Sequence, residues 1–362
     1  MHANSYVIFE TRLENNISYN KLRSYLNNLG LTEESINNGM NIKKKHKFIW
    51  FKYINSLNKN ILDNFYDMSF FLTNIIPKID CITNKYKLYE NMEKNFPDTF
   101  LKMMPHSFKL TNDTKFDDKS IYIARPVNIK KANFAASNGY GVFVYDSEES
   151  LKFVKDKADE FDIVVSSKYM TNPLLFQERK FHLRCHMFIT IINNKLSGHI
   201  CDTYKIMLAR EPYKNEDYQN KNIHDTHHLG IDDKDYLFPH HFTRDNVSNI
   251  EFNDSVIPEI YKQIRNICKH ITIIAGKNVK LQSNAVNSFH LLGCDFLIDS
   301  NLNVILLECN RFCDISDKNE GNYKIFLDRF WDWVNDIILK PAFLNDNSCD
   351  KDAVYIEVGN FK

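Results

Sequence analysis

The stretch of residues 289–310, FHLLGCDFLIDSNLNVILLECN, constrains the fold of this chain more than any other. Two apolar runs lie on either side of a short polar break, and each run is long enough for one strand. This pattern predicts an antiparallel β-hairpin that is closed by a two-residue turn at Ser300 and Asn301. In that register Asp295 lies opposite Leu306, because directly paired residues share a face of the sheet.

Three oxygen-bearing side chains converge on one face of this predicted hairpin. Side chains alternate between the two faces of a strand, so Glu308 and Asn310 share a face with Leu306 and therefore with Asp295. Packing gives an apolar hairpin no reason to bring two carboxylates and an amide together, whereas Mg²⁺ binds such oxygens along with phosphate oxygens. The alternative is an ordinary hairpin whose polar groups face solvent. A one-residue shift in register would separate Asp295 from Glu308.

A second cluster is positive and lies in a strand-like segment rich in branched and aromatic residues. Lys180, His182 and Arg184 share one face of that segment, and Arg179 and Lys168 are close to them in sequence. Long cations inside an apolar strand need anions, and phosphate or carboxylate ligands would serve. The alternative is an exposed edge strand that uses charge to block aggregation.

Two further patterns leave alternatives open. Gly139 and Gly141 lie between two predicted strands, where their backbone amides would cradle a phosphate or form a tight hairpin turn. The polar segment 198–254 indicates a long loop, and its histidines include His224 and His228 at a spacing of four. Helical patterning and a flanking carboxylate are missing there, so zinc is the weaker interpretation.

Composition excludes several classes of protein. The 362 residues include 46 Lys and Arg and 46 Asp and Glu, so no whole-protein basic field exists for nucleic acid or a membrane. We find no secretory signal pattern and no apolar run of the ~18 residues that a membrane span needs. Eight cysteines without CxxC pairs favour reduced thiols in the cytoplasm, which is the host cytoplasm for a viral protein. We expect an N-terminal lobe over 1–104, a central lobe over 105–178, a C-terminal lobe over 179–343 and a polar tail over 344–362.

Taken in order over about residues 70–343, these segments resemble the tubulin–tyrosine ligase family, a branch of the ATP-grasp superfamily. VVSSKYMTNPLLFQERKFHLR, residues 164–184, is similar to the family's Lys-Tyr-x-x-x-Pro-Leu-Leu followed by Arg-Lys-Phe-Asp-hydrophobic-Arg. The hairpin segment is similar to its Phe-x-x-Phe-Gly-x-Asp-Phe and Leu-Glu-Val-Asn strands. IYIARP looks like its Trp-Ile-x-Lys-Pro strand, and NGYGVFV like its Gly-x-Gly-Ile loop. The resemblance implies an α+β, ATP-grasp fold that holds the nucleotide between two largely antiparallel sheets, with an added N-terminal lobe.

The resemblance also assigns roles to single residues. It implies that Arg184 holds the transferring group or the acceptor carboxylate, and that Arg184, Lys180 and Glu308 are catalytic. Asp295, Glu308 and Asn310 would hold Mg²⁺, in agreement with the hairpin pattern. The residues that it implies at the nucleotide are Lys85, Arg125, Gly139, Gly141, Lys168, Tyr169, Lys180 and His182.

The activity that the resemblance implies is that of an ATP-dependent carboxylate–amine ligase. A carboxylate of a protein acceptor would be activated as an acyl-phosphate, and a free amino acid would displace the phosphate. Tubulin or another protein with an acidic tail is the expected acceptor. Four positions depart from the family pattern: Arg125 replaces a lysine, Ser167 a glutamine, His182 an aspartate and Met207 an arginine. Met207 and His182 motivate the alternative of a catalytically impaired ATP- or partner-binding module with the same fold.

Overall fold

A computed structural model describes residues 3–9, 19–34, 45–51, 69–126, 142–161, 163–226, 243–247, 249–281, 284–311, 321–346 and 354–356. The strands in these residues are β1 (Ala3–Phe9), β2 (Thr32–Glu33), β3 (Lys45–Phe51), β4 (Ser69–Thr73), β5 (Ser107–Lys109), β6 (Tyr122–Pro126), β7 (Phe143–Tyr145), β8 (Ile163–Lys168), β9 (Leu175–Phe176), β10 (Arg179–Ile192), β11 (Lys195–Leu208), β12 (Ala285–Ile298), β13 (Val304–Asn310) and β14 (Val354–Ile356). The helices are α1 (Asn20–Asn28), α3 (Asp80–Thr83), α4 (Lys85–Asn95), the 3₁₀-helix η3 (Phe100–Lys102), α5 (Glu148–Phe161), α6 (Lys221–His224), α7 (Val256–Asn278), α8 (Gly321–Val334), the π-helix η6 (Asn335–Leu339) and α9 (Lys340–Leu344).

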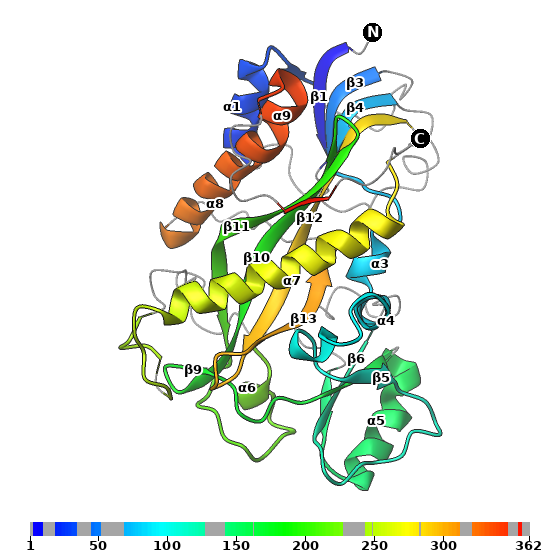
Figure 1. Ribbon diagram of the computed structural model, residues 1–362, viewed down its shortest axis with the longest axis vertical. Helices are drawn as coiled ribbons and strands as arrows, with labels where there is room; N and C mark the ends of the chain where they lie inside the picture. The colour runs from blue at the N-terminus through cyan, green and yellow to red at the C-terminus, as the bar shows by residue number, and fades with distance from the viewer. Residues whose placement is uncertain are drawn as a thin grey trace.

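The larger of two sheets runs through the middle of the molecule (Figure 1). In the described part of the chain its strands follow the order β14-β11-β10-β12-β4-β3-β1-β2, with β13 beside β12 and β9 beside β10. The strands from β14 to β12 pair antiparallel, and those from β12 to β2 pair parallel. Because β4 pairs with β12, the predicted N-terminal and C-terminal lobes share one sheet, and the boundaries between the lobes stay a prediction.

The turn between β10 and β11 shows why the chain folds back there. Asn193 and Asn194 have φ angles of 52° and 63°, which a two-residue hairpin turn requires and asparagine tolerates. The prediction of a loop over 198–254 is therefore wrong in its first part, since β11 extends to Leu208. Polar residues such as His199 and Lys205 conceal this strand in the sequence, because they are buried in the folded protein instead of facing solvent.

Helices cover both faces of the larger sheet. Helix α7 lies across one face, and isoleucines at spacings of three and four residues form its buried stripe: Ile260, Ile264, Ile267, Ile271 and Ile274. Helices α1, α8 and α9 lie on the other face (Figure 1). There Trp331 of α8 has its ring centre 5.3 Å from that of Tyr19 and 5.4 Å from that of Trp50 on β3. The first strands and the last helices therefore share one aromatic core.

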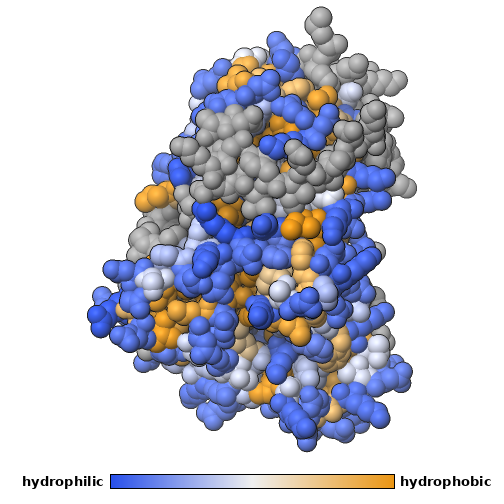
Figure 2. Space-filling model, in the orientation of Figure 1, coloured by the Kyte–Doolittle hydropathy of each residue, from blue (hydrophilic) through white to orange (hydrophobic). Residues whose placement is uncertain are grey.

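The second sheet, in the order β5-β8-β6-β7, is antiparallel throughout and packs against α5. The predicted α+β fold with two sheets is confirmed, although the larger sheet is parallel from β12 through β4, β3 and β1 to β2. Hydrophilic residues cover most of the described surface on the face in Figure 2. Among the described residues, no helix is both long enough and apolar enough to cross a membrane.

Candidate active site

The register of the β12–β13 hairpin differs from the prediction because its turn is longer. Phe296, rather than Asp295, pairs with Leu306. The backbone N–H of Asp299 donates to the carbonyl oxygen of Asn303 at 3.0 Å, so three residues, 300–302, lie between this pair instead of the predicted two. The Asp299 carboxylate also accepts hydrogen bonds from the backbone N–H groups of Asn301 and Asn303 at 2.9 and 2.8 Å. This side-chain contact stabilises the wider turn and shifts the pairing by one residue.

A β-bulge at Leu307 then reverses the effect of that shift. Phe296 pairs with Leu306, but the next residue of β12, Asp295, pairs with Glu308. Leu306 therefore packs in the core beneath α7, and Glu308 projects from the opposite face; the prediction that these two side chains share a face is wrong. Without the bulge the shifted register would have separated the two carboxylates, so this irregularity is what places them directly opposite each other.

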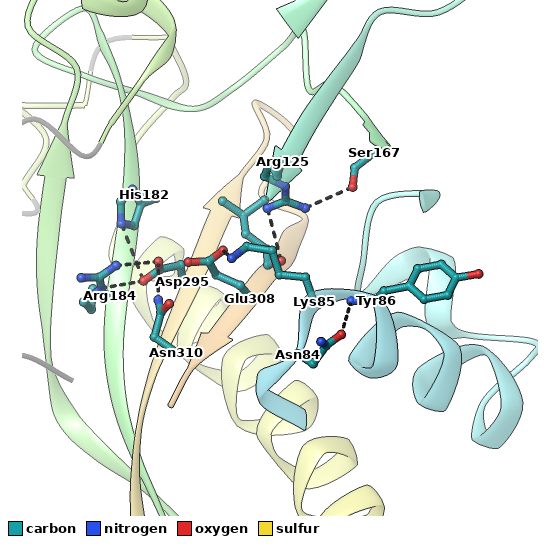
Figure 3. Close-up of polar contacts among 11 residues, drawn as sticks. Asn84, Lys85, Tyr86, Arg125, Ser167, His182, Arg184, Asp295, Glu308 and Asn310 are labelled. Carbon is teal, nitrogen blue, oxygen red and sulfur yellow. Dashed lines mark hydrogen bonds and ion pairs between the residues drawn. The ribbon is translucent and has the colours of Figure 1, made fainter. Parts of the chain in front are cut away.

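Asp295 lies where β10, β12 and β13 meet, and it is fully buried. Arg184 binds it with two hydrogen bonds, from Nε to Oδ1 at 2.8 Å and from Nη2 to Oδ2 at 2.7 Å (Figure 3). The Nδ2 of Asn310 donates to Oδ2 at 3.2 Å, and the Nε2 of His182 lies 3.7 Å from Oδ1. Burial by itself raises the pKa of the Asp295 carboxyl, but Arg184 and His182 outweigh burial and hold that pKa below its ordinary value.

Glu308 is paired with a different cation. The Nζ of Lys85 lies 2.9 Å from its Oε2. Lys85 is the first residue of α4, and the side chain of Asn84 accepts hydrogen bonds from the backbone N–H groups of Tyr86 and Lys87. This N-cap determines where the helix begins. It thereby aims the lysine at the hairpin (Figure 3).

Arg125 joins the second sheet to the same place. It lies on β6 and is buried, and its Nη1 donates to the carbonyl oxygen of the bulge residue Leu307 at 3.4 Å. Its Nη2 donates to the hydroxyl of Ser167 on β8 at 3.1 Å. Burial lowers the pKa of the guanidinium, and the Glu308 and Asp295 carboxylates act in the opposite direction. The Nε of Arg125 has no hydrogen-bond partner among the described residues. This N–H group could therefore donate a hydrogen bond to a bound anion.

Lys180 belongs to a neighbouring polar group at the start of β10. Its Nζ donates to the hydroxyl of Tyr169 at 2.8 Å and lies 4.1 Å from the centre of that ring. The same hydroxyl lies 2.7 Å from the Nδ1 of His224. Burial lowers the pKa of Lys180 to about 7. His182 connects this group to Asp295. Its Nδ1 lies 2.6 Å from the hydroxyl of Thr226, two residues after His224, and its Nε2 lies 3.7 Å from the Oδ1 of Asp295.

The structure does not bring every predicted residue to these groups. The side chain of Lys168 is exposed, although its backbone N–H donates to the carbonyl oxygen of His106 at 2.8 Å. Gly139 and Gly141 lie outside the described residues. His224 uses both ring nitrogens in hydrogen bonds. In the ranges that the structure describes, no three His, Cys, Asp or Glu side chains form a metal-binding group, so the zinc interpretation gains no support.

Sequence reasoning missed two residues that shape the site. Asn84 precedes a helical run, and that is a recognisable N-cap signal. The bulge at Leu307 cannot be recognised in the sequence, because the extra residue of β13 is apolar like its neighbours.

The donor set fits Mg²⁺. Carboxylate oxygens of Asp295 and Glu308 and the amide of Asn310 are the hard oxygen ligands that this ion takes. Mg²⁺ often binds through one or two carboxylates plus substrate phosphates. Two carboxylates with cations around them therefore suit a metal that arrives together with a nucleotide.

These elements define the class of protein. Two sheets meet at a hairpin with facing carboxylates, and cations reach it from α4, β6 and β10. The C-terminal domain of Pby1 from K. lactis, an ATP-grasp enzyme reported to interact with the mRNA decapping enzyme Dcp2, has the same architecture. Its crystal structure matches with a TM-score of 0.63 and 19% identity over 99% of each chain. The fold is therefore the ATP-grasp fold.

The chain belongs to the tubulin-tyrosine ligase family, whose model matches residues 66–345. It is 27% identical over 222 residues to tubulin glycylase 3C of Tetrahymena thermophila, a match that covers 57% of this chain and 19% of that protein. It is 24% identical over 264 residues to the inactive polyglycylase TTLL10 of Homo sapiens, with 60% and 35% covered. The matched region is thus a minor part of each relative. The predicted family is confirmed.

Proposed function

We propose that this chain is an ATP-dependent carboxylate–amine ligase that joins an amino acid to a protein acceptor. The observation that carries the proposal is the pairing of Asp295 with Glu308 across the hairpin, with Lys85, Arg125 and Arg184 close by. Buried carboxylates in that arrangement are costly for stability unless cations neutralise them. The excess of positive side chains around them suits a triphosphate.

The proposed reaction has two steps. An oxygen of the acceptor carboxylate attacks the γ-phosphorus of ATP, and the bond to ADP breaks, which gives an acyl-phosphate. The amine of the amino acid then attacks the acyl carbon, inorganic phosphate leaves, and the amine loses a proton as the amide forms. A bound Mg²⁺ would neutralise phosphate charge and orient the phosphate oxygens.

The residues of the chain mainly position and neutralise charge. Asp295, Glu308 and Asn310 would hold the metal. Lys85 and Arg125 would bind phosphate oxygens, since both already lie at the hairpin. Lys180 would bind the nucleotide, together with the predicted contributions of Gly139, Gly141, Lys168, Tyr169 and His182. Arg184 would hold the transferring group or the acceptor carboxylate. Fixed cations of this kind lower the activation barrier of phosphoryl transfer by stabilising negative charge, and they form no covalent bonds themselves.

The proposed partners are a protein acceptor with an acidic tail, such as tubulin, and a free amino acid in the cytoplasm. A relative named as a tubulin glycylase supports a tubulin acceptor. The test is release of ADP by the purified chain with ATP, Mg²⁺, a mixed pool of amino acids and acidic peptides. Mass spectrometry of the peptides then identifies the added residue. Absence of both ADP release and added mass, with folded protein, would reject the ligase.

A catalytically impaired module with the same fold is the second candidate. Met207 pairs with His182 on the neighbouring strand, so two departures from the family pattern face each other in the structure. A relative named as an inactive polyglycylase also favours it. Calorimetry combined with the ADP-release assay separates the candidates, because an impaired module binds Mg·ATP but releases no ADP when acceptor peptides and amino acids are present.

A further inference from the structure

His224 has contacts that neither a zinc site nor the proposed ligase roles account for. It ends the short helix α6 and is 6% exposed, and its two polar neighbours Lys180 and Tyr169 are 4% and 5% exposed. The three side chains come from β10, from the residue after β8 and from α6. They form one continuous row of hydrogen bonds within the fold.

The direction of each hydrogen bond in this row follows from the chemistry of its atoms. The Nε2 of His224 lies 3.0 Å from the carbonyl oxygen of Glu216, which only accepts, so Nε2 carries the proton. In the neutral imidazole Nδ1 then has a lone pair and accepts from the Tyr169 hydroxyl at 2.7 Å. The hydroxyl oxygen is left to accept from the ammonium of Lys180 at 2.8 Å.

The surroundings keep His224 neutral and in place. Burial lowers its pKa, and the nearby Lys180 ammonium adds to this, while backbone contacts at Glu216 and Asp217 act in the opposite direction. The rings of Tyr213 and Tyr218 lie 5.8 and 5.1 Å from the imidazole. A protonated imidazole would have no lone pair for the hydroxyl, whose proton would then turn toward the ammonium.

We propose that His224 is a positioning residue for Lys180. The imidazole fixes the orientation of the Tyr169 hydroxyl, and that hydroxyl holds the lysine ammonium where the nucleotide is expected. This inference rests on the proposed function, because it assumes that Lys180 meets a nucleotide. Asp225 is the carboxylate that acts on Lys180 from the neighbouring loop. The backbone carbonyl oxygen of His224 lies 3.5 Å from the Nζ, so the hydroxyl at 2.8 Å is the nearer neutral acceptor.

The test is calorimetry of Mg·ADP binding to the full chain and to variants. Tyr169→Phe keeps the ring beneath the ammonium and removes the acceptor, and His224→Leu removes the imidazole. We expect each to weaken binding roughly tenfold, the usual size for a hydrogen bond to a charged group. The double variant should weaken it no further, because both changes break one chain. His224→Asn keeps an oxygen near the position of Nδ1 and should retain most of the affinity.

Tyr218→Phe is the matched control. It removes a hydroxyl from the same cluster, but that hydroxyl bonds to Asn215 and not to Lys180. Affinity equal to wild type is expected for this variant. Melting temperatures of all variants establish whether they are folded. If His224→Leu does not fold, Tyr169→Phe still tests the proposal.

The dependence of Mg·ADP affinity on pH gives a second measurement. A purely structural role of His224 would leave this dependence unchanged. Tyr169→Phe removes the hydroxyl acceptor, and His224→Leu removes the group that orients it. Each change should lower the pKa of Lys180 further, so affinity should begin to fall at a lower pH in both variants. Wild-type affinity in Tyr169→Phe, or losses that add in the double variant, would overturn the positioning role alone. If the wild type does not bind Mg·ADP, the proposed function fails and the positioning role fails with it.

Discussion

Glu308 is a charge that the protein itself already neutralises, because Lys85 lies 2.9 Å from it. Glu308→Gln removes one metal ligand charge and also the repulsion from Asp295 across the hairpin. The Lys85 and Glu308 side chains are only 19% and 11% exposed. Because the amide oxygen of a glutamine still accepts from the lysine and the repulsion from Asp295 is relieved, we expect little change in the melting temperature. Turnover measured as ADP release should fall on the order of 100-fold or more. A large drop in melting temperature would instead make Glu308 a structural residue.

In the proposed site Lys85 would compete with a metal for Glu308 and would also bind phosphate. Lys85→Met should therefore strengthen binding of Mg²⁺ alone several-fold and weaken binding of Mg·ATP. Calorimetry with each ligand separates the two effects. Lys87→Met is the control, since Lys87 lies on the same helix but pairs with the exposed Asp80. Parallel changes in both affinities would contradict a dual role for Lys85.

If Lys180 binds the nucleotide as proposed, nucleotide binding should depend on pH. Burial holds its pKa at about 7 in the empty protein, and a bound phosphate favours the charged form and raises that pKa. Binding just above neutral pH should therefore take up protons, and affinity should decrease as the pH rises through about 7. Calorimetry in buffers with different heats of ionisation measures this uptake. Lys180→Arg stays charged and should abolish it; uptake that persists in this variant would assign the proton to another group.

At the scale of elements, the contact between β11 and α7 depends on the absence of a side chain. A Cβ at Gly198 would lie 2.0 Å from the Oγ1 and 2.9 Å from the Cγ2 of Thr272. Thr272 cannot move away easily, because it is buried and its hydroxyl donates to the carbonyl oxygen of Cys268 at 2.8 Å. We expect Gly198→Ala to lower the free energy of unfolding by about 1–3 kcal/mol.

Denaturant titration measures that loss, and a second substitution identifies its cause. Thr272→Ala makes room for the new methyl group, so the double variant should be more stable than the sum of the two single losses predicts. Additive losses would show that the steric contact is not responsible.

At the scale of the whole molecule, ligand binding should stabilise both sheets together. Arg125 of the second sheet reaches Leu307 of the first, and a nucleotide at this place would contact both. A ligand at about 100 times its Kd adds about 2.7 kcal/mol to the free energy of unfolding, so Mg·ADP should raise the melting temperature by several degrees. ADP with a chelator should not, since the two carboxylates then repel the phosphates. Equal shifts under both conditions would argue against a metal-dependent site.

The sequence determined much of this protein. Periodicity identified the hairpin strands and the charged face of β10, because burial of one face imposes a period of two on strands. Ordered motifs identified the family and the ATP-grasp fold. The types of residue at Asp295, Glu308 and Asn310 predicted a place for a hard cation, since the chemistry of an oxygen ligand belongs to the side chain itself.

Tertiary structure decided how those side chains meet. The carboxylate of Asp299 widened the turn, and the bulge at Leu307 restored the opposition of Asp295 and Glu308. Neither feature can be recognised from the sequence, because one extra residue in a turn or in an apolar strand looks like any other residue of that segment. The strand β11 was concealed for a related reason: its polar residues are buried against partners distant in sequence, and a pattern of polarity along the chain does not contain those partners.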